Sequence, residues 1–226
     1  SNNIVGSNVP ADYINRVGIE LQHTVNGVIS GNDVMGPENG NDLLSQIGII
    51  YFNSCSNTKI TGNKIHDFYS NGPSSIGIKC SNDNNTTVTE ISNNLIYNIK
   101  CNGINPGPAQ NNAYGIYVRT GGNIRMWHNT IYLSGPFLNG TDSFAPSSSC
   151  IGIHEAAVPV GLFDIRDNIL RNSMTNPANP NPPTENRAYG IMITATVEAG
   201  AGIFSQLDYN DYYIDGYQGS IAQRYE

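Results

Sequence analysis

Charged side chains are scarce in this sequence. Asp, Glu, Lys and Arg make up 13% of the 226 residues, against roughly 25% in an average soluble domain. Most of the charge that is present is acidic, because 18 Asp and Glu against 11 Lys and Arg give a formal net charge of -7. This sign is wrong for nonspecific binding to phosphate backbones, so we expect no nucleic acid partner.

Long apolar runs are absent as well. No stretch approaches the roughly 18 consecutive apolar residues of a membrane-spanning helix, although hydrophobic residues make up 38% of the chain. We therefore expect no insertion into a membrane.

Cysteine is rare, and its spacing follows no metal-binding pattern. Cys55, Cys80, Cys101 and Cys150 form neither a CxxC pair nor a Cys/His set, so we expect no structural zinc and no cofactor. Calcium is possible, although no motif indicates it. Disulfide pairing is open too: Cys80 has the phase of a small buried hydrophobic residue, whereas a bond between Cys101 and Cys150 would join loops two coils apart.

Asn and Gly are present in excess. The chain holds 32 Asn and 24 Gly, two residue types that disfavour helices and favour turns. A mainly helical fold is thereby excluded.

A repeat organises the chain. Six copies of the tripeptide apolar-Gly-Ile recur at spacings of 30, 29, 38, 37 and 38 residues, starting at Val17, Ile47, Ile76, Tyr114, Ile151 and Tyr189. A second signature follows each copy: an apolar residue, two variable residues, Asn, one variable residue and an apolar residue. Its six asparagines are Asn32, Asn63, Asn94, Asn129, Asn168 and Asn210.

Short runs of alternating apolar residues within each unit indicate about three strands. A unit of this size cannot close a core alone, so the units must stack into a parallel β-helix of about six three-strand coils, an all-β solenoid. We expect the six asparagines to form an internal ladder of amide hydrogen bonds. We also expect one internal column of isoleucines, formed by Ile19, Ile49, Ile78, Ile116, Ile153 and Ile191.

At these residues the sequence resembles the right-handed parallel β-helix repeats of the pectate-lyase-like superfamily, including its carbohydrate-binding and sugar-hydrolase repeats. The resemblance covers about residues 13 to 215. The closing segment from Leu207 to Tyr213 is also similar to the last coils of β-helix segments in large secreted bacterial surface proteins. The resemblance thus implies a right-handed helix and an extracellular or cell-surface location, reached by bacterial-type secretion.

Residues rich in Pro, Asn, Gly and Ser connect the repeats at 36–46, 69–75, 100–112, 134–149 and 173–187. We interpret these connections as surface loops at one corner, so residues 1–226 form a single β-helix domain. Neither end shows a capping helix, and we therefore expect the domain to be a fragment of a longer chain, whose other domains are possible partners.

Equivalent positions lie above one another in such a stack, so outward side chains form columns. One column, predicted to be a solvated charge ladder, holds Val28, Lys59, Glu90, Arg125, Asp164 and Gln206. A second holds Ser30, Thr61, Ser92, Trp127, Arg166 and Asp208, flanked at the corner by His128, Asp167 and Tyr209.

The second column supplies the candidate binding site. Trp127 is the only Trp and has the outward phase, where a large apolar side chain is unusual. A sugar ring can stack on an indole while charged groups bond its hydroxyls, so Trp127, Arg166, His128 and Asp208 are the predicted substrate-binding residues. The alternative is that Trp127 lies under a folded-back loop.

Candidates for catalysis are weak. Lyases of the superfamily need a base and cations around a uronate carboxylate, and Lys79, Arg119 and His154 match these roles only loosely. We place Lys79 and His154 in a third outward column, Glu20, Ile50, Lys79, Tyr117, His154 and Met192. The Gly-His-Gly and Arg-Ile-Lys motifs of the hydrolases do not occur. Asp167 and Asp208 are one coil apart and are candidates for a carboxylate pair separated by about 5 to 10 Å.

Three further residues have an ambiguous or unremarkable setting. Glu155 falls at the inward place held elsewhere by Leu21, Tyr51, Cys80, Val118 and Ile193; it is either buried with a partner or turned outward by a bulge. His23 and His66 fall near turns on different coils and are interpreted as surface or corner residues that form no metal set.

The sequence favours a non-catalytic extracellular module that binds a polysaccharide or cell-surface glycan, or that acts as a rigid adhesive or structural spacer. The alternative is a polysaccharide lyase or glycoside hydrolase acting on an acidic polysaccharide. A scaffold without a convergent set of acid and base side chains favours the first.

Overall fold

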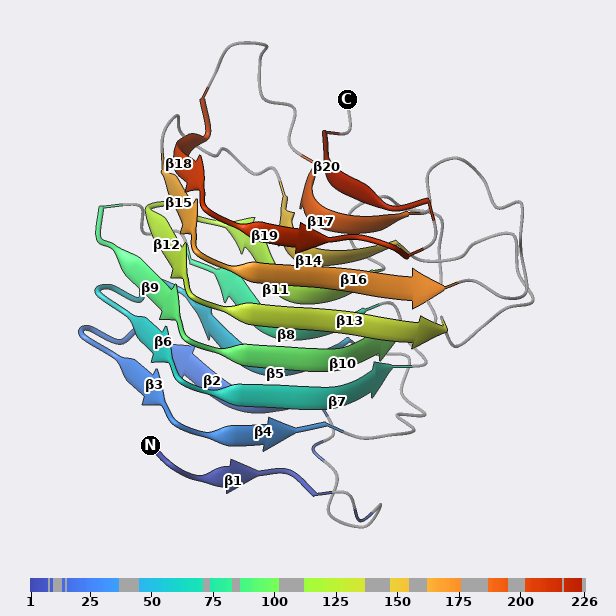
Figure 1. Cartoon of the computed structure of the whole chain (residues 1–226). Coiled ribbons are helices and arrows are strands. Elements are labelled where there is room, and N and C mark those ends of the chain that lie inside the picture. Colours follow the sequence, from blue (N-terminus) through green and yellow to red (C-terminus); the bar gives the residue numbers. More distant parts are fainter. Residues whose placement is uncertain are drawn as a thin grey trace.

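The computed structural model describes residues 1–7, 9, 14, 16–36, 45–70, 74–82, 86–101, 112–136, 147–154, 162–175, 187–194, 202–216 and 218–224. Regular secondary structure in these ranges is entirely β-strand, and the strands wind into a stack with β1 and β20 at opposite ends (Figure 1). Among the described residues, no helix has the length and hydropathy needed to cross a lipid bilayer.

The strands form three sheets, each named here by its first strand. The β1 sheet contains β1 (Ile4–Val5), β4 (Asp33–Met35), β7 (Lys64–Ser70), β10 (Leu95–Cys101), β13 (Thr130–Pro136), β16 (Ile169–Thr175) and β19 (Asp211–Tyr213). The β2 sheet contains β2 (Val17–Gln22), β5 (Gln46–Phe52), β8 (Ser75–Ser81), β11 (Ala113–Thr120), β14 (Ser148–Ile153), β17 (Ala188–Ile193) and β20 (Ser220–Arg224). The β3 sheet contains β3 (Val28–Ser30), β6 (Lys59–Thr61), β9 (Thr89–Ser92), β12 (Ile124–Trp127), β15 (Phe163–Arg166) and β18 (Phe204–Asp208).

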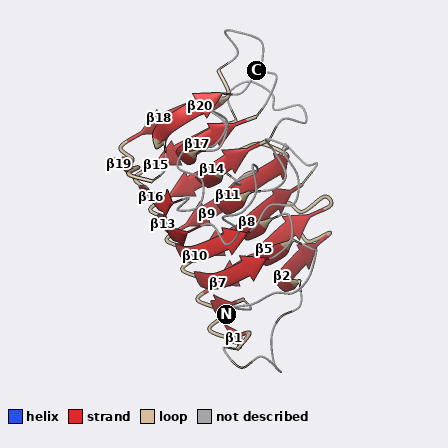
Figure 2. Cartoon of the chain, turned by 90° about the vertical axis from the view of Figure 1, so that its right-hand side faces the viewer, coloured by secondary structure: helices blue, strands red, loops and turns tan. Residues whose placement is uncertain are grey.

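Each strand from β1 to β17 pairs in parallel with the strand three places further along the chain, for example β5 with β8 and β8 with β11. The chain therefore visits each sheet once per coil, and Figure 2 shows the strands of successive coils lying one above the other. The predicted fold class, an all-β parallel β-helix of about six three-strand coils, is confirmed.

The asparagine ladder is confirmed in detail. Each Nδ2 donates to the Oδ1 of the next ladder residue at 2.8 to 3.0 Å, from Asn32 through to Asn210. In the interior rungs it also donates to a backbone carbonyl, as Asn94 does to Ile60 at 2.9 Å. Asn3, which the sequence analysis did not include, adds a rung by donating to Asn32 at 3.0 Å.

The residue before each ladder asparagine takes a left-handed backbone conformation. Its φ lies between 53° and 66° in all six coils, at Gly31, Gly62, Asn93, His128, Asp167 and Tyr209. This bend turns the chain from the β3 sheet into the β1 sheet. It also brings the asparagine side chain inward, where the ladder residues Asn32, Asn63, Asn94, Asn129 and Asn168 are all buried.

The predicted isoleucine column is wrong at one member. Ile116 pairs with Ile151, and Ile151 with Ile191, so Ile151 occupies the place predicted for Ile153. Ile153 instead pairs with Val118 and Ile193, which is the inward place predicted for Glu155. Glu155 itself lies outside the described residues.

Close packing explains why the strands pair in this register and not in the one that would align the tripeptide starting at Ile151 with its other copies. At Gly77, an added Cβ would stand 2.5 Å from the Gly115 carbonyl oxygen and 2.6 Å from Cγ2 of Ile96. The same conflict, with the next strand and with a β-branched side chain, holds at Gly18, Gly48 and Gly115. The next place in this column belongs to Cys150, because its neighbours Ser149 and Ile151 pair with Tyr114 and Ile116. In that coil the residue in register with Ile131 is Leu170, which is not branched at Cβ.

The cysteines are all buried, and no disulfide joins any two of the four. The expectation that Cys101 and Cys150 lie in the loop corner is wrong, because Cys101 ends β10 and Cys150 lies within β14. Cys80 is in the core as predicted, and burial raises the pKa of its thiol to about 12. These side chains therefore act as small hydrophobic residues.

Candidate ligand-binding surfaces

The β3 sheet places the predicted binding residues on its outer face in consecutive coils. Trp127 pairs with Ser92 on one side and with Arg166 on the other, and Arg166 pairs with Asp208. The column deduced from the repeat phase is therefore the column in the structure. Apolar neighbours on the same strand, Ile124 and Met126, point into the core.

Trp127 is half-buried, and two cations lie near its ring. The guanidinium carbons of Arg125 and Arg166 lie 5.4 and 5.1 Å from the centre of its ring. Both distances lie within the range of cation-π attraction. Its indole Nε1 is buried and has no hydrogen-bond partner in the described part of the chain. The indole is thus fixed by its neighbours, and part of its surface remains exposed.

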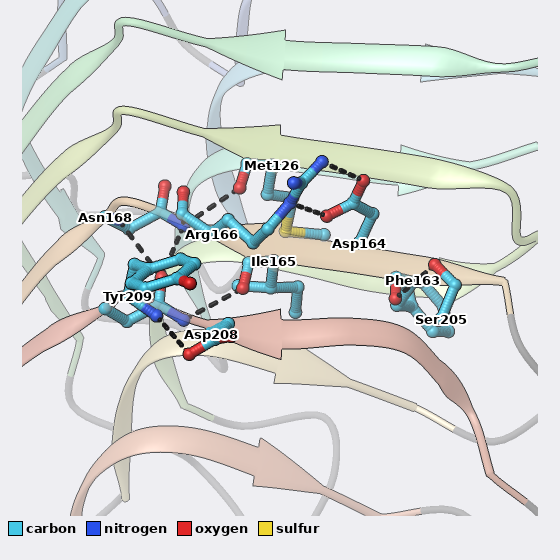
Figure 3. Close-up of polar contacts among 10 residues, drawn as sticks. Met126, Phe163, Asp164, Ile165, Arg166, Asn168, Ser205, Asp208 and Tyr209 are labelled. Atoms are coloured by element: carbon cyan, nitrogen blue, oxygen red, sulfur yellow. Dashed lines mark hydrogen bonds and ion pairs between the residues drawn. The ribbon is translucent and has the colours of Figure 1, made fainter.

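Arg166 is committed to an acid on its own strand. Figure 3 shows its guanidinium gripping the Asp164 carboxylate through two contacts, Nε to Oδ1 at 2.6 Å and Nη2 to Oδ2 at 2.8 Å. This hydrogen bonding to Asp164 holds the pKa of Arg166 above its ordinary value. Arg166 therefore has less capacity for a ligand than the sequence suggested, whereas Arg125 is exposed and forms no ion pair with a described carboxylate.

The predicted charge ladder has the expected column but only one direct contact along it. Lys59 lies 3.7 Å from Glu90. Asp164 pairs in register with Arg125, yet its carboxylate bonds Arg166 instead. The exposed Lys59 contact is of a kind that contributes between about 0 and 1 kcal/mol.

The corner residues lie beside this column. His128 and Asp167 are exposed and left-handed, and the Asp208 carboxylate accepts a hydrogen bond from the backbone N–H of Tyr209 at 2.9 Å. Both predicted acids, Asp167 and Asp208, are exposed.

His154 is not part of this corner, because it follows β14 in the β2 sheet. Its predicted column is also wrong: Tyr117 and Met192 pair with Gly152. The reason is the same two-residue offset that displaced Ile153. The His154 ring instead lies edge-on to Tyr117, with ring centres 6.4 Å apart.

The repeat signatures did not suggest a further column on the β1 sheet, which lies three residues after each ladder asparagine and in which four of six side chains carry rings. Its members are Met35, His66, Tyr97, Tyr132, Arg171 and Tyr213. His66 stacks on Tyr97 with ring centres 4.9 Å apart and an interplanar angle of 3°. Arg171 lies 4.8 Å from the rings of both Tyr132 and Tyr213. The constant three-residue offset from the ladder asparagine is the sequence signal that could have identified this column.

His66 is the centre of a polar network, so its assignment to a surface or corner is wrong. It is 3% exposed within β7, and its Nδ1 and Nε2 contact Asp67 at 2.7 Å and Asp33 at 2.8 Å. Carboxylates only accept, so both contacts are hydrogen bonds when both ring nitrogens carry protons. Lys64 donates to the other oxygen of Asp33 at 3.0 Å.

A third feature is an open cavity of about 390 Å³ on the outer face of the β2 sheet. Lys79 and Arg119 line it together with Ile50 and Phe52. Burial, and then the charges of Arg119 and Arg16, hold the pKa of Lys79 below its ordinary value. Two of the residues that loosely matched lyase roles thus share one cavity, and His154 is not among the residues that line it.

Among the described residues, no group of three or more His, Cys, Asp or Glu side chains is arranged to hold a metal ion. Comparison of the chain with protein families, with curated proteins and with solved structures gave no match. Functional inference therefore rests on these surfaces.

Proposed function

We propose that this chain is an extracellular or cell-surface module of the pectate-lyase-like superfamily that binds glycan and does not catalyse a reaction on it. The superfamily and the location are proposed from the repeat signatures. The observation that supports glycan binding is Trp127, the only Trp of the sequence, which is partly exposed on an outer sheet face with two guanidinium groups near its ring.

The surroundings of Trp127 suit a sugar. A pyranose ring presents C–H groups that pack on an exposed indole surface, and its hydroxyls need donors and acceptors at the edge of that surface. Arg125 offers donors, because its guanidinium is exposed and forms no ion pair with a described carboxylate. Asp208, exposed two strands away from Trp127, offers acceptor oxygens.

Rigid spacing is a second role that the architecture favours. The asparagine ladder runs without interruption from Asn3 to Asn210, and two of the sheets extend over seven strands each. A continuous set of hydrogen bonds parallel to the long axis resists bending, which suits a structural or adhesive spacer that holds other domains apart.

The enzymatic alternative has less support. Asp167 and Asp208 are exposed corner carboxylates, and His154 follows a strand of a different sheet. Acid-base catalysis needs side chains that converge on one reacting centre. We therefore assign these three residues no catalytic role in the proposal.

The test of the proposal is binding of a panel of neutral and acidic glycans, with the Kd of the wild type and of each variant measured by titration calorimetry and the wild type also followed by the fluorescence of Trp127, its only Trp. A sugar that covers the indole should shift or quench its emission. Trp127→Ala should weaken binding at least about thirtyfold, because truncation of a packed aromatic anchor costs about 2 kcal/mol or more.

Lys59→Ala is the matched control, since Lys59 is exposed in the β3 sheet and should leave the Kd within about twofold. If Trp127→Ala leaves the Kd of a bound glycan unchanged, Trp127 is not the binding site. Release of reducing ends, or of products that absorb ultraviolet light, would instead support the enzymatic alternative.

A further inference from the structure

The cavity on the β2 sheet is basic, although the chain is acidic. The formal net charge of the whole chain is -7, yet Lys79 and Arg119 both line this cavity, and no Asp or Glu is among its described lining residues. Arg16, just before β2, adds a third positive charge that acts on Lys79. A concentration of like charge is unfavourable without a counterion.

No described acid neutralises these cations. No ion pair joins Lys79, Arg119 or Arg16 to a carboxylate in the described ranges. Glu20 stands in the same outward column as Lys79 but two strands away, a separation of about 9 to 10 Å. Burial also raises the pKa of Tyr117, the strand neighbour of Lys79, to about 12. Its phenol is therefore uncharged near neutral pH.

The remaining lining gives the cavity two chemically different sides. Ile50 and Phe52 form an apolar part, while the Asn53 and Ser81 side chains can bond hydroxyls. All of these residues lie in or next to the ends of β5, β8 and β11, which are neighbours in one sheet (Figure 2). Both cations therefore come from neighbouring strands of one sheet.

We propose that this cavity binds an oxyanion, the carboxylate or sulfate group of a sugar-sized ligand, with Lys79 and Arg119 as its two cationic contacts. The half-buried Lys79 ammonium supplies the point charge, and the exposed Arg119 guanidinium can grip two oxygens at once. The ring of the ligand lies on Ile50 and Phe52. This site is on a different sheet from Trp127 and does not depend on glycan binding there.

NMR titration of the labelled chain with three probes tests the proposal. D-glucuronate and glucose 6-sulfate should shift the amide signals of residues 50–53, 79–81 and 119–120, whereas uncharged glucose should not. Comparison of the two anions identifies whether carboxylate or sulfate is preferred. The bound anion should also raise the pKa of Lys79, because it favours the charged ammonium.

Variants separate this site from the surface around Trp127. Lys79→Met and Arg119→Gln should each raise the Kd for the anion at least about tenfold. Lys59→Met removes an equal charge from the β3 sheet and should leave the Kd within about twofold. Arg119 is exposed, so Arg119→Gln remains informative if Lys79→Met fails to fold. Equal binding of glucose and the anions, or an equal loss in Lys59→Met, would overturn the proposal.

Discussion

At the scale of single residues, adjacent positions in one bend have opposite tasks. Asn93 is exposed, with a φ of 55°, whereas Asn94 is buried and its side chain donates and accepts within the ladder. The first position needs only tolerance of a left-handed backbone. That tolerance is why Gly, Asn, His, Asp and Tyr all occur there, the larger ones at a cost of about 1 kcal/mol each. The second position needs an amide, and every coil has Asn.

Asp33 illustrates a residue whose charge state matters for stability. Burial raises its pKa, but hydrogen bonds from Lys64 and His66 outweigh burial, so the pKa lies below the ordinary 3.8. Because the folded pKa is depressed, the stabilisation is present above the ordinary value and is lost as pH falls through the folded pKa. Asp33→Asn should therefore be less stable than the wild type at pH 6, by at most about 1 kcal/mol since Asp33 is partly exposed.

Urea denaturation at a series of pH values measures this difference. The gap between wild type and Asp33→Asn should shrink as pH falls below about 4. A gap that stayed constant down to pH 2 would show that the carboxylate charge contributes nothing to folding.

At the scale of elements, the register of a β2-sheet strand depends on one position that leaves little or no room for a side chain. Gly77 leaves room for the Gly115 carbonyl and for the branched side chain of Ile96. Gly77→Ala should destabilise the fold by about 1 to 3 kcal/mol, because backbone of the next coil must move. Gly202→Ala is the control, since nothing lies within 4 Å of its added Cβ. Thermal unfolding followed by circular dichroism compares them, and equal midpoints would contradict the packing argument.

The elements also show what sequence can predict. In the β3 sheet the phase relative to the ladder asparagine placed every outward residue correctly, because the bend fixes the register there. In the β2 sheet the tripeptide at Ile151 misled, since register follows packing rather than sequence identity, and Cys150 takes the glycine place. Asn3 was predictable: Asn2-Asn3-Ile4-Val5 matches Asn93-Asn94-Leu95-Ile96 in type at each position.

The candidate sites were only partly predictable for a physical reason. Columns follow from repeat phase, so Trp127 and Arg166 were correctly placed together. Choice of partner does not follow from phase, because Asp164 bonds Arg166 rather than its strand neighbour Arg125. Burial of His66 depends on contacts from three coils, those of Asp33, Asp67 and Tyr97. The basic character of the cavity depends on which side chains surround Lys79 and Arg119, and no described acid pairs with either. A single sequence does not reveal these neighbours.

At the scale of the whole molecule, the ladder is one network that joins all the coils, and its rungs should not be energetically independent. Asn94→Ala removes two donated and two accepted side-chain hydrogen bonds and should cost about 1 to 3 kcal/mol. Asn93→Gly, next to it in the bend, should cost little, because glycine accepts the left-handed backbone freely. Comparison of their urea midpoints establishes the contribution of one rung.

A double-mutant cycle then tests coupling. Asn94 and Asn129 share a side-chain hydrogen bond of 3.0 Å, so replacing both by Ala should cost less than the sum of the single changes, by about 0.5 to 3 kcal/mol. Asn32 and Asn168 are separated by three further rungs and share no partner, so their Ala substitutions should add within about 0.5 kcal/mol. Additivity in both pairs would mean that each rung contributes independently. Coupling in both pairs would mean that one substitution distorts the whole ladder. Only coupling confined to neighbours fits a stack in which each coil contacts the next.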